Sequence, residues 1–164
     1  MTSALLALGS NLGDSVSLLK SAIERLDAHP NITLLAVAGL YRTEPVGGPE
    51  QSDFWNSACL IETSLAPAAL LATCHQIEAL AGRERIEHWG PRTLDIDLID
   101  YEGFTSAVPT LQVPHPRACE RRFVLQPLVD IVPDWLLDGV SVTERLQSLE
   151  NAFDVELFAA EWAS

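Results

Sequence analysis

The order of strand-like and helix-like segments is the feature that most restricts how this chain can fold. Apolar or alternating segments rich in β-favouring residues predict strands over residues 3–8, 32–41, 54–63 and 93–101. Apolar residues at helical spacing follow the first and third of these strands, from Leu18 to Leu26 and from Leu70 to Leu80. The order β-α-β-β-α-β predicts an α+β fold, a ferredoxin-like split βαββαβ sandwich with both helices on one face of an antiparallel sheet.

The connections and the C-terminal third complete this outline. Gly82 is expected to end the second helix, and a charged loop is expected from Arg83 to Arg92. Residues 42–52 contain Pro and Gly at several positions and predict a long loop. After a hairpin turn at Glu102-Gly103, additional C-terminal strands and helices are predicted at residues 111–113, 121–128 and 142–149.

Composition and charge limit the possible partners. The 164 residues are expected to form one domain, residues 1–164, and 48% hydrophobic content is typical of a globular protein. A net charge of −13 argues against nucleic acid or an anionic membrane as a partner. Three cysteines without paired spacing predict neither a disulfide framework nor a zinc site. No leader or membrane-spanning pattern is evident, so a cytoplasmic protein is expected.

The fourth predicted strand carries two acids that can hold metal ions. Asp95 and Asp97 alternate with apolar residues, so both carboxylates lie on one face of the strand, roughly 7 Å apart at the backbone. That spacing suits two Mg²⁺ ions about 3.5–4 Å apart, and Arg92 adds donors for phosphate. Taken alone, an Asp-x-Asp pair is more often a solvated polar face. The Trp-Gly-Pro-Arg segment before it and the apolar opposite face favour the metal site.

Residues 88–99, His-Trp-Gly-Pro-Arg-Thr-Leu-Asp-Ile-Asp-Leu-Ile, resemble the signature of the 6-hydroxymethyl-7,8-dihydropterin pyrophosphokinase family. These folate-pathway enzymes move a pyrophosphoryl group from ATP to a pterin alcohol. Four other segments resemble family motifs in the expected order: residues 9–13, 41–45, 54–56 and 113–117. The resemblance therefore extends over nearly the whole chain.

The resemblance implies a nucleotide site with ATP as co-substrate and two Mg²⁺ ions held by Asp95 and Asp97. The residues implied in catalysis are Arg83, Arg85, Arg92, Asp95 and Asp97. Those implied in ATP binding are His75, Glu78, Arg85, Trp89, Arg92, Ile99, His115 and Arg121. Without the family, the two loop arginines would be a solvated turn, His115 a turn residue, and His75 with Glu78 a polar helix edge. Implied chemistry is attack of the pterin hydroxyl on the β-phosphorus with release of AMP.

The resemblance also implies a pterin site. Phe54 and Phe123 resemble the pair that sandwiches the ring, and Asn56 resembles the side chain that reads its edge. Completing the site are Thr43, Pro45 and Val46, with Trp89 as part of a lid. Core packing is the alternative for each aromatic. An amide inside an otherwise apolar strand needs a hydrogen-bond partner if it is buried.

Some positions depart from the family pattern, and two other functions fit parts of the sequence. Phe54 stands where tyrosine is frequent, His75 replaces an amide, Pro116 replaces an aromatic, and the segment between Arg85 and Trp89 is shorter by one residue. A non-catalytic ferredoxin-like binding module would bind a small molecule without consuming ATP. A two-metal nucleotidyltransferase with a small substrate would release pyrophosphate instead of AMP. The protein is expected to be a monomer, and its expected partners are small molecules.

Overall fold

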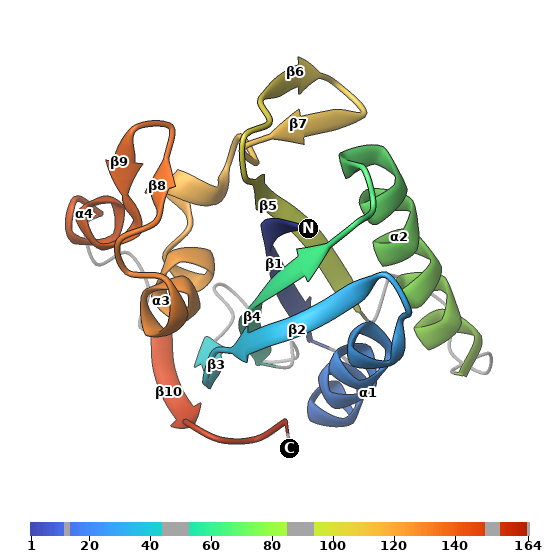
Figure 1. The fold of residues 1–164 in the computed structure, drawn as a ribbon. Coiled ribbons are helices and arrows are strands. Elements are labelled where there is room, and N and C mark those ends of the chain that lie inside the picture. The colour runs from blue at the N-terminus through green and yellow to red at the C-terminus, as the bar shows by residue number, and fades with distance from the viewer. Residues whose placement is uncertain (12–13, 44–52, 85–93, 150–154, 164) are drawn as a thin grey trace.

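The computed structural model describes residues 1–11, 14–43, 53–84, 94–149 and 155–163 (Figure 1). Its helices are α1 (Ser15–Ala28), α2 (Pro67–Glu84), α3 (Arg122–Ile131) and α4 (Val142–Gln147), with a 3-10 turn at Ala118–Glu120. Its strands are β1 (Thr2–Ser10), β2 (Ile32–Val37), β3 (Leu40–Thr43), β4 (Phe54–Thr63), β5 (Asp95–Tyr101), β6 (Ser106–Val108), β7 (Leu111–Val113), β8 (Leu136–Leu137), β9 (Val140–Ser141) and β10 (Val155–Ala159).

A six-stranded sheet forms the centre of the described part of the molecule. Its strands follow the order β10-β3-β4-β1-β5, with β2 also paired to β4, and all of these pairs are antiparallel. The register places Gly9 of β1 between Asn56 of β4 and Asp95 of β5. Three residues that are far apart in sequence therefore meet at one end of the sheet.

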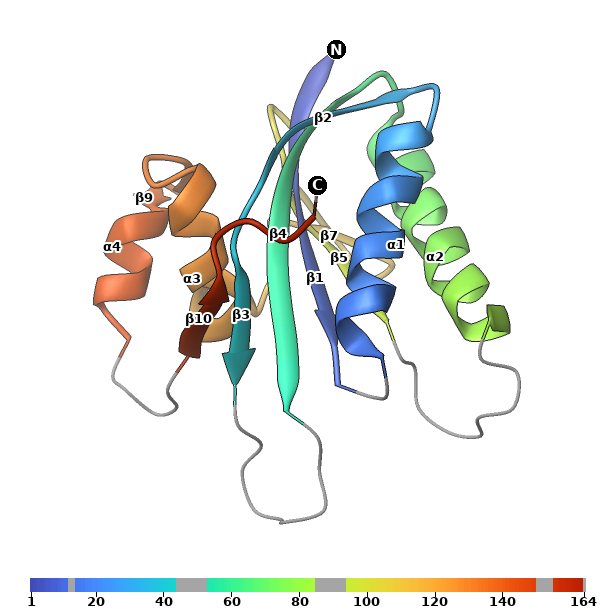
Figure 2. The same cartoon turned by 90° about the horizontal axis from the view of Figure 1, so that it is seen from below.

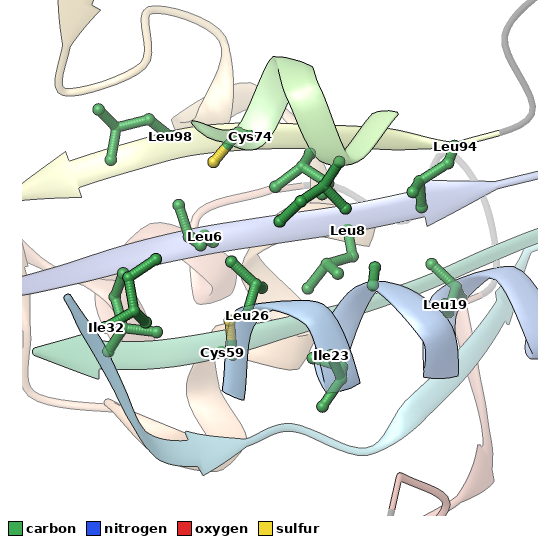
Figure 3. Packing of buried hydrophobic residues seen from close by; sticks show 14 of the residues in the cluster. Leu6, Leu8, Leu19, Ile23, Leu26, Ile32, Cys59, Cys74, Leu94 and Leu98 are labelled. Carbon is green, nitrogen blue, oxygen red and sulfur yellow. The ribbon is translucent and has the colours of Figure 1, made fainter. Parts of the chain in front are cut away.

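Helices α1 and α2 cover one face of this sheet (Figure 2). Every second residue of β1 points to them, and Leu6 and Leu8 are almost fully buried. In Figure 3 Leu6 lies between Cys74 of α2 and Leu26 of α1, and Leu8 lies farther along the same strand. Both helices thus lie on one face, as the sequence predicts.

The cysteines of this core are packing residues. Cys59, Cys74 and Cys119 are free thiols, and the first two are buried. Burial raises the pKa of Cys59 and raises that of Cys74 to about 12. Both thiols therefore stay protonated at neutral pH and are poor nucleophiles.

The opposite face of the sheet is covered by α3, and α4 packs against α3 (Figure 2). The alternate residues of β1, Leu5 and Ala7, pack there with Leu125 and Leu128 of α3. Pro127 lies inside α3 and is buried with this group. The N-terminal end of α3 lies near the end of β1 that carries Gly9, where side chains from both surround a cavity.

Two predictions about the elements are wrong in detail, and one strand was not predicted. The strand predicted at residues 32–41 is two strands, because the Gly39 N–H turns to Asp130 Oδ2 of α3 (3.1 Å). Helix α2 continues through Gly82 to Glu84, so Arg83 is in its last turn and not in a loop. A glycine costs a helix only about 1 kcal/mol and does not end it alone. Finally, β10 extends the sheet beside β3, which local patterns did not predict.

None of the helices in the described part of the chain is long and apolar enough to cross a membrane.

Candidate active site

A cavity of about 400 Å³ opens at the end of the sheet where β1, β4 and β5 meet the start of α3. Its walls are formed by Ala7, Leu8, Gly9, Ser10, Asn11, Phe54, Asn56, Ser57, Asp95, Asp97, Arg121, Phe123 and Val124. The two predicted metal ligands and three of the predicted pterin contacts thus share one cavity. Its volume is in the range of small-molecule sites.

Strand β5 delivers the two acids to this cavity. Ile96 and Leu98 are buried against α2, so Asp95 and Asp97 point to the other face. Asp95 is exposed and Asp97 is half-buried. Carboxylate oxygens are the hard ligands that Mg²⁺ prefers, so the donors present fit that ion. The described residues contain no cluster of three or more His, Cys, Asp or Glu side chains with metal-site geometry. Phosphate oxygens would therefore have to supply part of the coordination.

Glu78 holds β5 between these acids. Its Oε2 accepts a hydrogen bond of 2.7 Å from the backbone N–H of Ile96. Ile96 pairs with β1 on its other side, and β5 is the edge strand of the sheet. A charged acceptor on an edge N–H makes a stronger bond than a neutral one. Glu78 thereby fixes the backbone from which Asp95 and Asp97 project.

Asn56 contributes a buried oxygen that lacks a partner. The residue is 9% exposed, and in the part of the chain that the structure describes its Oδ1 makes no hydrogen bond. The buried Oγ1 of Thr43 likewise makes no hydrogen bond among the described residues. Thr43 pairs with Phe54 and Tyr41 pairs with Asn56, so these side chains lie on adjacent strands. An unpaired buried oxygen costs about 1–3 kcal/mol unless a ligand satisfies it.

The two phenylalanines form apolar parts of the cavity wall. Phe54, at the start of β4, is 40% exposed, and Phe123, in the first turn of α3, is half-buried. The guanidinium carbon of Arg121 lies 5.7 Å from the centroid of the Phe123 ring. This distance allows a cation–π attraction that orients Arg121 at the cavity.

His115 lies close to this site but is not on the cavity wall. Its backbone N–H donates to the carbonyl of Ile99 (2.8 Å), and its Nδ1 accepts from the N–H of Arg117 (3.2 Å). Burial lowers the pKa of His115, Asp97 opposes this shift, and Arg121 and Arg117 add to it. The ring is therefore neutral at pH 7 with its proton on Nε2, where it can donate to a phosphate oxygen.

Ile99 and His75, which are also implied in ATP binding, do not line the cavity either. Ile99 is buried in the apolar group beneath α3. His75 is exposed on α2 and lines a second hollow of about 400 Å³ between α2 and the β6–β7 hairpin. The walls of that hollow are mainly apolar and include Leu71, Phe104 and Leu111.

The remaining predicted site residues lie wholly or partly outside the residues that the structure describes. Pro45, Val46, Arg85, Trp89 and Arg92 are not among the described residues. For Arg83 only the helical backbone of α2 is described.

Sequence reasoning assigned no role to three residues of the cavity wall. Gly9 and Ser10 end β1 and Asn11 follows it, and Gly9 is paired with both Asn56 and Asp95. Their motif was visible in the sequence, but a role requires knowledge of their neighbours. The register of β1 with β4 and β5 supplies that knowledge.

Known proteins resemble this chain in sequence and in fold. Residues 5–133 match the family described as 7,8-dihydro-6-hydroxymethylpterin-pyrophosphokinase (HPPK). A 2-amino-4-hydroxy-6-hydroxymethyldihydropteridine pyrophosphokinase of Methylorubrum extorquens is 45% identical over 150 residues, covering 92% of this chain and 95% of that protein. The Bacillus subtilis enzyme of the same name is 44% identical over 128 residues, covering 78% of this chain and 77% of that protein.

A solved structure supports the same fold. The HPPK-DHPS protein of Plasmodium falciparum aligns with a TM-score of 0.72 at 16% identity, covering 89% of this chain and 44% of that longer chain. At such low identity the likeness concerns the fold alone. The match over residues 5–133, together with the two relatives above 40% identity, makes this chain a member of the 7,8-dihydro-6-hydroxymethylpterin-pyrophosphokinase family.

Proposed function

We propose that this protein transfers a pyrophosphoryl group from ATP to the hydroxymethyl oxygen of 6-hydroxymethyl-7,8-dihydropterin and releases AMP. The observation that carries the proposal is the shared cavity: Asn56 Oδ1 has no hydrogen-bond partner among the described residues, and Asp95 and Asp97 face the same space. The unpaired oxygen suits a ligand with N–H donors on a flat ring. The two acids suit a polyphosphate with divalent cations.

In this proposal the pterin binds against β4. Phe54 and Phe123 supply apolar surfaces for the faces of the ring, and Asn56 Oδ1 accepts from its N–H edge. Thr43 lies on the neighbouring strand, and its buried hydroxyl makes no hydrogen bond to the part of the chain that the structure describes. Pro45, Val46 and Trp89 complete this site in our proposal. The hydroxymethyl group would then point along the cavity to the acids of β5.

In this proposal the triphosphate of ATP binds beside β5. Asp95 and Asp97 would hold two Mg²⁺ ions, which neutralise phosphate charge and align the phosphates when bound. Arg121 is oriented by Phe123 toward the same cavity, and His115 Nε2 can donate a hydrogen bond nearby. Arg83, Arg85 and Arg92 are proposed to add positive charge. Ile99 and Glu78 act in this arrangement through β5 and its hydrogen bonds.

The base of ATP is proposed to lie toward the second hollow. That hollow contains His75 and has apolar walls of the kind that an aromatic base contacts. Strand β5 pairs with β1 and also contacts α2 and β7, so the elements that form the hollow adjoin the strand that carries the acids.

The reaction depends on the positioning of its two substrates and requires no covalent intermediate with the protein. The pterin oxygen forms a bond to the β-phosphorus while the bond from this phosphorus to the α–β bridging oxygen breaks, and the bridging oxygen leaves with AMP. The hydroxyl proton passes to solvent or to a phosphate oxygen. The protein's residues align the two groups in line and stabilise the negative charge, which accounts for most of the rate in such transfers.

We infer that the architecture is the ferredoxin-like split βαββαβ sandwich. In support of this, β5-β1-β4 and the β2/β3 pair occupy the sheet order of that fold, with C-terminal elements added around it. Residues 1–164 are proposed to form one domain that acts as a monomer in the cytoplasm on small-molecule substrates.

Product analysis tests the function. The protein would be incubated with ATP, Mg²⁺ and 6-hydroxymethyl-7,8-dihydropterin, with a control that lacks the pterin. AMP and a pyrophosphorylated pterin should appear in equal amounts and only when the pterin is present. ADP would indicate γ-phosphoryl transfer, released pyrophosphate would indicate nucleotidyl transfer, and absence of any nucleotide product would indicate a binding module.

A further inference from the structure

A glycine on the cavity wall faces Asn56, whose Oδ1 has no hydrogen-bond partner among the described residues. Gly9 of β1 is directly opposite Asn56 of β4 in the antiparallel register. Ala7, two residues earlier, packs on the α3 side of the sheet, so position 9 also faces that side. Gly9 and Asn56 therefore border the same space.

The contact between these residues leaves no room for a side chain at position 9. A Cβ atom built on Gly9 would lie 3.0 Å from Asn56 Nδ2 and 3.9 Å from the carbonyl oxygen of Trp55. Ordinary contacts between carbon and other heavy atoms are about 3.5–4.0 Å. A larger residue at position 9 would thus displace the Asn56 amide by several tenths of an ångström.

We propose that Gly9 is a positioning residue for ring recognition: its missing side chain sets where the Asn56 amide stands and thereby where its unpaired oxygen meets the heterocycle. The identity of the ligand rests on the proposed function, whereas the contact of Gly9 with Asn56 does not. Gly9 acts only through Asn56 in this proposal, because the crowded atom is the amide nitrogen.

The chain offers a matched control for a glycine-to-alanine change. Gly82 is exposed in α2, and a Cβ atom there would meet no atom of the described residues within 4 Å. Gly82→Ala therefore adds the same methyl group without a collision, and it favours the helix slightly. It should leave both ligand affinities unchanged.

The experiment is a double-mutant cycle of Gly9→Ala and Asn56→Ala, with Gly82→Ala beside it. Binding of fluorescent 6-hydroxymethylpterin would be titrated in the presence of Mg²⁺ and α,β-methylene-ATP, and the affinity for that nucleotide would be measured separately. Gly9→Ala should weaken pterin binding roughly tenfold or more, as expected for one misplaced buried hydrogen bond, and leave nucleotide affinity within about twofold.

The cycle distinguishes action through Asn56 from a general effect. In the Asn56→Ala background the added methyl group has no amide to displace, so Gly9→Ala should cause no further loss. Additive losses, or unchanged pterin binding by Gly9→Ala, would overturn the proposal.

A ligand-free readout separates this inference from the proposed function. The side-chain NH₂ resonances of Asn56 should shift in Gly9→Ala and stay in place in Gly82→Ala. Unmoved resonances would refute the positioning role even in an active enzyme. Conversely, a wild-type protein that neither binds the pterin nor forms AMP would refute the function, while shifted resonances would still support the contact.

Discussion

The two faces of the central sheet use the same strands for different purposes. On the side of α1 and α2, β1, β4 and β5 present apolar side chains in a closed core. On the side of α3 the same strands present an apolar group at one end and Asn56, Asp95 and Asp97 at the other. The first face stabilises the fold, and the second also provides the cavity.

This difference follows from how much of each face is covered. Helices α1 and α2 have 14 and 18 residues and cover the strands along most of their length. Helix α3 has 10 residues, and side chains of its first turn border the cavity. Polar side chains are tolerated where water or a ligand can reach them and are costly where it cannot. Shorter coverage therefore makes room for the chemistry.

The largest expected effect is the loss of a carboxylate on the cavity face. Asp97→Asn keeps the size of the side chain but removes a charge proposed to hold Mg²⁺, so kcat/KM should fall about 10³-fold or more. Thermal unfolding should change little, because Asp97 is only half-buried. Steady-state AMP formation measures this, with the exposed Asp14→Asn as control. Wild-type turnover by Asp97→Asn would contradict the metal assignment.

A core truncation on the other face should do the reverse. Leu26→Ala removes a fully buried side chain of α1 and should lower the free energy of unfolding by about 2–5 kcal/mol. Activity per folded molecule should remain near the wild-type value. Urea denaturation followed by circular dichroism measures the first quantity. A large loss of kcat in the folded variant would show that the two faces are not separable.

Glu78 links helix α2 to β5, the strand that carries the two acids, so its removal should have an intermediate effect. Glu78→Ala removes the acceptor for the Ile96 N–H, which should speed hydrogen exchange of that amide and raise the Mg²⁺ concentration for half-maximal activity by roughly tenfold. Glu78→Gln keeps an acceptor oxygen and should restore most of both properties. The exposed Gln76→Ala serves as control. Unchanged exchange at Ile96 in Glu78→Ala would contradict the positioning role.

The smallest expected effect concerns a buried carboxylate beyond the cavity. Burial raises the pKa of Asp100, while hydrogen bonds from Trp135 Nε1 (2.8 Å) and the Tyr101 N–H (2.9 Å) oppose the shift. Because the folded-state pKa is raised, the stabilising contribution of proton binding is present at low pH and lost as pH rises through the folded pKa.

Trp135→Phe removes a donor that favours the charged form. It should therefore destabilise the protein by about 1–2 kcal/mol at pH 7, and the difference from wild type should shrink toward about pH 4. Urea midpoints across this range provide the test. A difference that stays constant across this range would show that lost packing, and not the hydrogen bond to Asp100, dominates.

Much of the fold could be read from local patterns, and the errors share one cause. Alternation in residues 94–99 and helical spacing in Leu18 to Leu26 report burial directly, and both predicted elements are present. The break at Gly39 depends on Asp130, and β10 depends on β3 as a pairing partner. Contacts between segments about 90 or more residues apart leave no periodic pattern in either segment.

The candidate site shows the same division. The facing of Asp95 and Asp97 followed from strand geometry, and the structure places both on the cavity wall. Glu78 was predicted to contact the nucleotide, and the structure adds a contact that the sequence did not indicate, a hydrogen bond from the Ile96 N–H to its carboxylate. Gly9 was seen only as part of a motif. Both roles involve an atom supplied by another element of the fold.

The sequence by itself determined which residues face inward, where the two acids stand along their strand, and the family to which the chain is similar, because period and motif are local properties. Only the tertiary structure decided that Gly9, Asn56 and Asp95 meet at one end of the sheet, and that Asn56 Oδ1 is buried among the described residues without a partner. Strand register determines these neighbours, and it is fixed by the packing of the whole sheet between its two helical layers.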